Sequence, residues 1–227
     1  MRVLIRRIVR RIIRAGQAFL AQIYRLVGRV EWYVAARKVR AWNVDKVNLC
    51  CGSQRVSGYL GVDYAVDAEL VLDLSRIDLP FPENSLDTIV CMSAINYFTY
   101  QRGGQLVRQI YRALRPGGVC RVGVQDMKEL AERYVRNNND FYFQKLPDGR
   151  ERFEGPTIGD KFAAWFYGYA SGPNRCQYFY DFQSLAHLFK EAGFAIIERR
   201  AFLDSRLSEV ELLDNRPDQM FFLEAVK

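Results

Sequence analysis

The stretch VNLCCGSQRVSGYLGVD, residues 47–63, decides the fold. It begins as an apolar strand, turns through the small residues 50–53, and ends as a second apolar strand at Asp63. A small-residue turn lets backbone amides approach a ligand, and an acid at the tip of the next strand can accept hydrogen bonds from ribose hydroxyls. The turn holds one glycine, Gly52, and Asp63 follows it sooner than in a dinucleotide fold. Alone, the stretch fits either a nucleotide cradle or a tight turn between two buried strands.

Short apolar runs separated by turns continue along the chain. They predict strands near 46–50, 59–63, 69–73, 86–92, 118–124, 195–201 and 219–226. Helical spacing predicts a helix over 103–115, which ends before Pro116-Gly117-Gly118, and another over 182–192, which ends at Gly193. Strands that alternate with helices are typical of a parallel α/β fold.

The first 42 residues differ from the rest of the 227-residue chain. They hold ten arginines, one lysine and a single acid, whereas the remainder is slightly acidic. Apolar residues recur there at helical spacing: Ile5, Ile8, Val9, Ile12, Phe19, Leu20, Ile23, Val27 and Val30. We therefore expect a basic amphipathic helical appendage at 1–42 and one catalytic domain at 43–227.

The cysteines and the hydropathy pattern indicate in which cellular compartment the protein is expected. The five cysteines lack metal-ligand spacing, so no metal site is predicted, and a reduced cytoplasmic setting is the simpler interpretation. No apolar run approaches the roughly 18 residues of a membrane span, and the N-terminus lacks the pattern of a signal peptide. We expect a cytoplasmic protein. Peripheral attachment to the inner face of a membrane is compatible with this expectation.

Five motifs in order carry a family resemblance: VNLCCGS, GYLGVDY, LVLDLSRIDLPFPENSLDTIVCMSAINYF, LRPGGVCRVGVQD and LFKEAGF. Together, over about residues 46–226, they resemble the class I S-adenosylmethionine-dependent methyltransferases. More narrowly, they are similar to the small "methyltransferase type 11"-like enzymes with an Asn-Leu-Gly-Cys-Gly opening, several of which are encoded among polysaccharide-synthesis genes. The resemblance implies a Rossmann-like, mostly parallel seven-stranded sheet with a shortened first crossover. Residues 127–180, after the predicted fifth strand, are rich in aromatic side chains, so we expect them to form an insertion on the acceptor side of the sheet.

The resemblance also implies S-adenosylmethionine as cofactor and assigns its contacts. Asn48 to Ser53 would surround the methionine part, Asp63 would bind the ribose, Asp73 and Leu74 the adenine, and Ser93 would lie beside the methyl group. The expected cofactor-binding set is Asn48, Cys50, Cys51, Gly52, Ser53, Asp63, Tyr64, Asp73, Leu74 and Ser93. Asp73 as the cap of a turn and Ser93 as a plain strand-end hydroxyl remain the alternative interpretations.

The chain departs from the family pattern at two places. Cys50 replaces the first glycine, and its Cβ would crowd the cofactor if the backbone there needs a positive φ. Ile95-Asn96-Tyr97 stands where relatives often have Leu-Glu-His, so a usual candidate base is absent. Tyr97 and Asp126 are the candidate catalytic residues, although Tyr97 also fits a core position. His187, the only histidine, is interpreted as a packing or partly exposed residue.

The insertion and the basic helix leave alternatives open. The aromatic rings of 127–180 fit a stacking surface for a sugar or another flat acceptor, and equally a small accessory core. The helix at 1–42 fits a solvated helix packed on the domain, an anionic membrane anchor or a nucleic-acid grip, of which the membrane surface is favoured. We predict O-methylation of a glycan or lipid-linked saccharide. The rivals are an RNA methyltransferase and a non-catalytic cofactor-binding protein.

Overall fold

The computed structural model describes residues 2–146, 148–167 and 176–227. Pro147 and residues 168–175 belong to the expected insertion and lie outside the described residues. Within α1 (Arg2–Trp42), the side chains at 2–15, 17, 18, 20, 21 and 25 are also outside the description, as is that of Tyr167 in α5.

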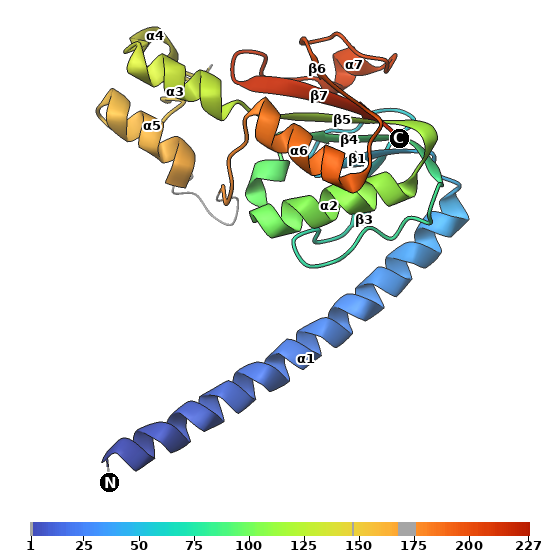
Figure 1. Ribbon diagram of the computed structural model, residues 1–227, viewed down its shortest axis with the longest axis vertical. Coiled ribbons are helices and arrows are strands. Elements are labelled where there is room, and N and C mark those ends of the chain that lie inside the picture. The colour runs from blue at the N-terminus through green and yellow to red at the C-terminus, as the bar shows by residue number, and fades with distance from the viewer. Residues whose placement is uncertain (1, 147, 168–175) are drawn as a thin grey trace.

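The described residues form one seven-stranded sheet with the order β3-β2-β1-β4-β5-β7-β6 (Figure 1). The strands are β1 (Lys46–Leu49), β2 (Leu60–Asp63), β3 (Leu70–Val71), β4 (Leu86–Met92), β5 (Leu114–Gln125), β6 (Ile196–Arg200) and β7 (Met220–Val226). The first five are parallel, and β7 runs antiparallel between β5 and β6. The predicted Rossmann-like, mostly parallel seven-stranded fold is confirmed.

The connection between β1 and β2 is short. Residues 50–59 form turns, in which Gln54 N–H donates to the Cys51 carbonyl at 2.9 Å and Tyr59 N–H donates to the Val56 carbonyl at 3.0 Å. Parallel neighbours usually need a helical crossover of a dozen or more residues. The ten-residue link is the shortened first crossover that the sequence predicted, and it brings the tip of β2 close to the end of β1.

Predicted boundaries were wrong for β3, for α2 (Tyr100–Ala113) and for the start of β5. β3 holds two residues rather than 69–73, because the Asp73 carboxylate accepts hydrogen bonds from Ser75 N–H and Oγ and draws the chain into a turn. α2 starts before the predicted Gly103, since the Thr99 hydroxyl caps it by accepting from Arg102 N–H at 3.2 Å. It also ends before the predicted Arg115, and Leu114 begins β5 in extended conformation.

Helices cover one face of the sheet. α2 packs against α6 (Phe182–Ala192), and both cover the main core together with the last turns of α1 (Figure 1). Gly193, with a φ of 105°, ends α6 as predicted. The opposite face is covered by a smaller cluster from the 50–59 connection, the chain after β6 and the short helix α7 (Val210–Leu213).

The insertion after β5 builds its own core. α3 (Met127–Val135), α4 (Asn139–Tyr142) and α5 (Ile158–Tyr167) surround a cluster at the end of the sheet where β5 finishes (Figure 1). The buried members are Leu130, Phe141, Tyr142, Phe153 and Trp165. Most of the described rings in this segment are therefore used for packing, as the accessory-core interpretation expects.

α1 is a single long helix that extends beyond the body of the domain (Figure 1). Its last turns pack on the core through Ala35, Ala36 and Val39, and it ends where Asn43 adopts a φ of 48°. Over the part of the chain that the structure describes, no helix is long and apolar enough to cross a membrane.

Candidate functional site

Asp63, the last residue of β2, fixes the turn that follows β1. The carboxylate of Asp63 accepts one hydrogen bond from Gly52 N–H and one from Ala65 N–H, both at 2.9 Å. Asp63 is 7% exposed, and Gly52 has a φ of 53° that glycine adopts without strain. The predicted ribose acid thus also fixes the shape of the turn that precedes it.

Cys50 adopts the left-handed backbone that the sequence analysis treated as the condition for crowding. Its φ is 53°, a conformation that costs an L-residue with a Cβ about 1–2 kcal/mol. A hydrogen bond with Cys91, together with burial, raises the pKa of the Cys50 thiol well above its usual value. The thiol therefore stays neutral. Strained backbone conformations cluster at functional sites, so the φ of Cys50 indicates that this turn belongs to one.

A first pocket of about 230 Å³ opens beyond this turn. It is lined by Cys50, Tyr64, Leu72, Asp73, Leu74, Ser75, Ala94, Tyr97, Phe98 and Gln177. Burial disfavours the charge of Asp73, but hydrogen bonds from Ser75 and Arg76 outweigh it and hold the pKa of this carboxyl below its usual value. Apolar walls with one ionised carboxylate suit a flat heterocycle that carries hydrogen-bond donors.

A second pocket of about 290 Å³ adjoins the first and shares Cys50 and Tyr97 with it. Its other lining residues are Asn48, Cys51, Gln54, Met92, Ser93, Asn215 and Arg216. Both pockets lie at the carboxyl ends of β1 and β4, where the strand order reverses. Open α/β sheets bind their ligands at this position.

Strain and unsatisfied polar atoms gather in the second pocket. Ser93 and Arg216 have φ values of 59° and 51°, so three non-glycine residues with left-handed backbone, counting Cys50, line it. Within the described structure, Asn48 Nδ2 and Asn215 Oδ1 are buried without a hydrogen-bond partner. A buried polar atom without a partner is costly, so this pocket is built for a polar ligand.

A buried ion pair positions the polar residues that the C-terminal part of the chain contributes to the second pocket. The guanidinium of Arg121, in β5, donates to both carboxylate oxygens of Asp214 at 2.7 and 2.6 Å, and both side chains are fully buried. Asp214 directly precedes Asn215 and Arg216. The pair therefore fixes this loop against the end of the sheet.

Several predicted residues lie beside the pockets rather than in them. Gly52, Ser53, Asp63 and Asp126 are outside both described linings. Asp126 caps α3 by accepting from Lys128 N–H at 3.0 Å, and its other oxygen accepts from Arg199 at 2.7 Å. Both of its oxygens are thus engaged in structural contacts.

Tyr97, the other candidate catalytic residue, borders both pockets. Burial raises the pKa of its hydroxyl, so this group is protonated at neutral pH and can donate a hydrogen bond. His187 is exposed on α6, in agreement with its interpretation from the sequence.

The pockets also contain residues that were not predicted from the sequence, among them Gln54, Gln177, Asn215 and Arg216. Met220 at the start of β7 pairs with Gln125 at the end of β5, so the residues before β7 lie at the carboxyl edge of the parallel strands. The polar run DNRPDQ before the last strand is the sequence feature that could have indicated Asn215 and Arg216. It points to the site only once β7 is known to run antiparallel.

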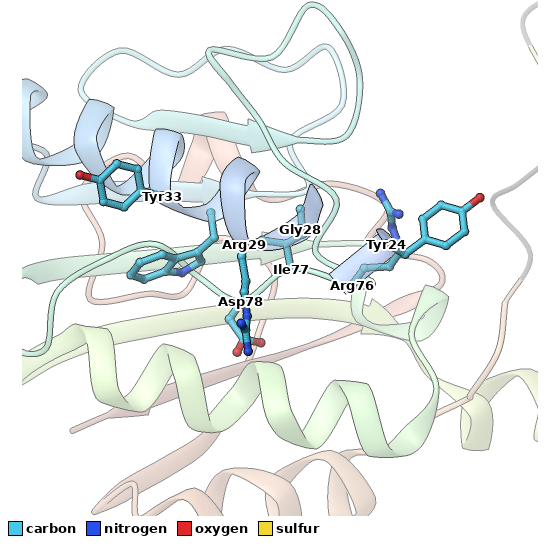
Figure 2. Close-up of a pocket in the computed structure, with 8 residues that line it drawn as sticks. Tyr24, Gly28, Arg29, Tyr33, Arg76, Ile77 and Asp78 are labelled. Carbon is cyan, nitrogen blue, oxygen red and sulfur yellow. The ribbon is translucent and has the colours of Figure 1, made fainter. Parts of the chain in front are cut away.

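A further cavity of about 530 Å³ lies away from the strand ends, between α1 and the loop after β3. Figure 2 shows its lining, which includes Tyr24, Arg29 and Tyr33 from the helix and Arg76 and Asp78 from the loop. Across the described residues, no cluster of His, Cys, Asp and Glu could hold a metal ion.

Residues 40–122 match the methyltransferase domain family, over β1 to β4 and most of β5. This segment is a class I S-adenosylmethionine-dependent methyltransferase domain. The family and cofactor class predicted from the five motifs are thereby confirmed.

The curated relatives of the methyltransferase domain cover part of the chain. A demethylmenaquinone methyltransferase of Listeria monocytogenes is 27% identical over 124 residues, which are 54% of this chain and 47% of the relative. A demethylmenaquinone methyltransferase of Listeria innocua matches to the same extent. The chain spans about half the length of the curated relatives it matches.

Solved structures with similar folds include an S-adenosylmethionine-dependent methyltransferase from Mesorhizobium loti. It has a TM-score of 0.47 and 15% identity, over 84% of this chain and 96% of that one. A phosphoethanolamine N-methyltransferase 2 from Haemonchus contortus, in complex with S-adenosyl-L-methionine, has a TM-score of 0.46 and 15% identity, over 81% of this chain and 49% of that one.

The residues that line the two pockets fit this cofactor class. The first pocket offers apolar walls and Asp73, which suit a nucleoside. The second offers the unpaired donor of Asn48, the unpaired acceptor of Asn215 and the charge of Arg216, which complement a zwitterionic amino-acid group. The two ends of S-adenosylmethionine have these chemistries, and Cys50 and Tyr97 stand where the pockets meet.

Proposed function

We propose that the protein transfers a methyl group from S-adenosylmethionine to a hydroxyl of a glycan or lipid-linked saccharide. The observation that carries the transfer is the pair of adjoining pockets, one suited to a nucleoside and one to an amino acid, at the switch point of a methyltransferase domain. The pockets meet at Cys50 and Tyr97, so the methyl-bearing centre belongs beside these two residues.

In this proposal the nucleoside lies against Leu72, Asp73 and Leu74, and the amino-acid group lies between Asn48 and Arg216. When bound, the cofactor supplies an electrophilic methyl group on a sulfonium. The protein's contribution is to hold the acceptor oxygen in line with that methyl group, because alignment provides most of the rate enhancement in such a transfer.

Tyr97 is the residue placed to orient the acceptor. Its hydroxyl is protonated at neutral pH, so it can donate a hydrogen bond to the acceptor oxygen while that oxygen loses its own proton. Gln177 fixes the Tyr97 segment, because Gln177 Nε2 donates to the Tyr97 carbonyl at 3.0 Å. Tyr97 is thus proposed as an orienting residue, and the acceptor proton leaves to solvent.

The acceptor class is supported by rings beside this point. Tyr178 follows Gln177 in the chain and packs on Tyr100, with ring centroids 4.9 Å apart. Tyr100 is 37% exposed, and an exposed aromatic face is a common platform for a sugar ring. The pair thus offers a stacking surface at the edge of the first pocket.

A second candidate acceptor is a prenylated quinone precursor. It is favoured by the sequence match to the Listeria demethylmenaquinone methyltransferases, which extends over about half of this chain. The same aromatic pair would accept a flat quinone ring, so the two acceptors need a direct comparison.

Transfer of radiolabel distinguishes these acceptors. The purified full chain is incubated with methyl-labelled S-adenosylmethionine and, in parallel, with lipid-linked saccharides, a demethylated prenyl quinone and total RNA. We expect label in the saccharide fraction and about tenfold less with Tyr97→Phe, as expected for the loss of one hydrogen bond that contributes about 1.5 kcal/mol. Label confined to the quinone or the RNA would replace the saccharide. Cofactor binding without transfer to any acceptor would favour the non-catalytic protein.

A further inference from the structure

The helix α1 has an inner face that packs on the methyltransferase body. Ala35, Ala36 and Val39 are between 3% and 6% exposed, and Trp32 Nε1 donates to the Leu79 carbonyl at 3.4 Å. Gly28 lies over Ile77, one turn earlier. The inner face therefore follows positions 28, 32, 35 and 39 along the helix.

A second line of apolar residues on α1 is exposed. The outer stripe consists of Phe19, Ile23, Leu26, Val30 and Val34, whose exposed fractions lie between 43% and 64%. These residues recur at intervals of three and four, so they share one face. Leu26 and Val30 are each two positions before an inner-face residue. Two residues turn the helix by about 200°, so the stripe points away from the body.

The charge of the helix indicates what covers this stripe. Residues 1–42 hold eleven basic residues and one acid, and the apolar spacing of the stripe continues in the sequence to Ile12 and Ile5. A second copy packed along the stripe would bring two strongly positive helices together, and like charges in proximity are destabilising. An anionic lipid surface accepts both the apolar stripe and its basic flanks.

We propose that the outer stripe of α1 docks on an anionic membrane surface, with the methyltransferase body held on the aqueous side of the helix. The inference concerns this face alone and does not depend on the reaction.

The cavity at the junction of helix and body fits this orientation. Tyr24, Trp32 and Tyr33 border it together with Arg29 and Arg76. Figure 2 shows Tyr24, Arg29 and Tyr33 on the helix and Arg76 on the loop after β3. Aromatic residues with a polar tip and arginines gather at the headgroup level of membranes. The cavity thus provides a basic, aromatic border on the aqueous side of the outer stripe.

Sedimentation with lipid vesicles tests the proposal. The full chain is mixed with phosphatidylcholine vesicles, with or without phosphatidylglycerol, at low and high sodium chloride. A stripe variant, Leu26→Asp with Val30→Asp, is compared with a control variant, Val135→Asp with Leu212→Asp, which changes exposed apolar residues of the body. Circular dichroism and binding of S-adenosylhomocysteine confirm that each variant is folded.

We expect the wild-type chain and the control variant to sediment with the anionic vesicles and to dissociate only partly in high salt. The stripe variant should bind the same vesicles roughly tenfold less well. Equal sedimentation of all three proteins, or a wild-type chain that stays in solution, would overturn the proposal. So would a dimer that the stripe variant abolishes, or preferential binding to duplex RNA. Because binding of S-adenosylhomocysteine is measured separately, a failure to bind vesicles would not bear on the proposed methyl transfer.

Discussion

The guanidinium of Arg216 donates a hydrogen bond of 2.9 Å to the hydroxyl of Ser93, across 123 positions of sequence. Both residues have left-handed backbone, and both line the second pocket. Each such conformation costs about 1–3 kcal/mol and persists only where the surroundings enforce it. The contact therefore ties the end of β4 to the loop before β7 at the place where the amino-acid group of the cofactor is proposed to lie.

Arg216→Ala should weaken binding of S-adenosylhomocysteine by about 10- to 100-fold, because a hydrogen bond to a charged group contributes about 1.5–3 kcal/mol. Calorimetry measures this change. Arg136→Ala is the matched control, since Arg136 is exposed on the insertion and pairs only with Glu132 among the described residues. Equal affinities for both variants would remove Arg216 from the site.

Cys50→Gly should be more stable than Cys50→Ala by about 1 kcal/mol, because glycine adopts the left-handed φ of this position at no steric cost. Both variants remove the thiol, so their difference isolates the backbone. Urea unfolding gives the free energies. Cofactor affinity of Cys50→Gly should equal or exceed that of the wild type. A clear loss of affinity would show that the thiol packs productively against the ligand.

The thiol of Cys50 should react slowly with iodoacetamide at pH 7. Its pKa is raised above the ordinary 9.0 by the contact with Cys91 and by burial, so the reactive thiolate becomes appreciable only at higher pH than for an ordinary cysteine. Bound S-adenosylhomocysteine should slow the reaction further, because Cys50 lines both pockets. Mass spectrometry of the peptide, with glutathione as reference, measures both rates. Rapid alkylation that cofactor leaves unchanged would contradict the assignment.

Asp214→Ala should destabilise the fold by about 3–5 kcal/mol, since it leaves the fully buried Arg121 without its bidentate partner. Cofactor affinity should fall as well, because Asp214 fixes the loop that carries Asn215 and Arg216. The double variant Arg121→Met with Asp214→Leu should recover part of the lost stability, because it removes both partners of the pair, and Glu224, the second carboxylate on Arg121, keeps its contacts with Arg206 and Ser205. A single variant as stable as the wild type would show that the pair does not anchor the loop.

The frame of the fold was predictable, since apolar runs and turn residues locate all seven strands and the end of α6. The turn after β1 and Asp63 were predictable for the same reason, because a small-residue turn and an acid at a strand tip form a local pattern. Asn215 and Arg216 were not, because they reach the site through the antiparallel direction of β7 and the ion pair of Arg121. These are long-range relations with no periodic signal.

Asp126 shows the opposite difficulty. An acid at the end of a central strand fits a catalytic position, yet Asp126 also begins a helix, where it accepts hydrogen bonds from Lys128 N–H and Glu129 N–H. The pairing of its second oxygen with Arg199 comes from β6, far along the chain. The sequence places such a residue at the correct edge of the sheet but cannot show which partners its carboxylate finds.

Titration of S-adenosylhomocysteine into the full chain by calorimetry shows whether the two pockets bind the cofactor. We expect one binding site per chain, and a loss of about 1–3 kcal/mol of binding free energy with Asp63→Ala, because Asp63 holds the turn at Gly52 and is the predicted ribose acid. No binding by the wild-type chain, or an affinity that Asp63→Ala leaves unchanged, would contradict this expectation.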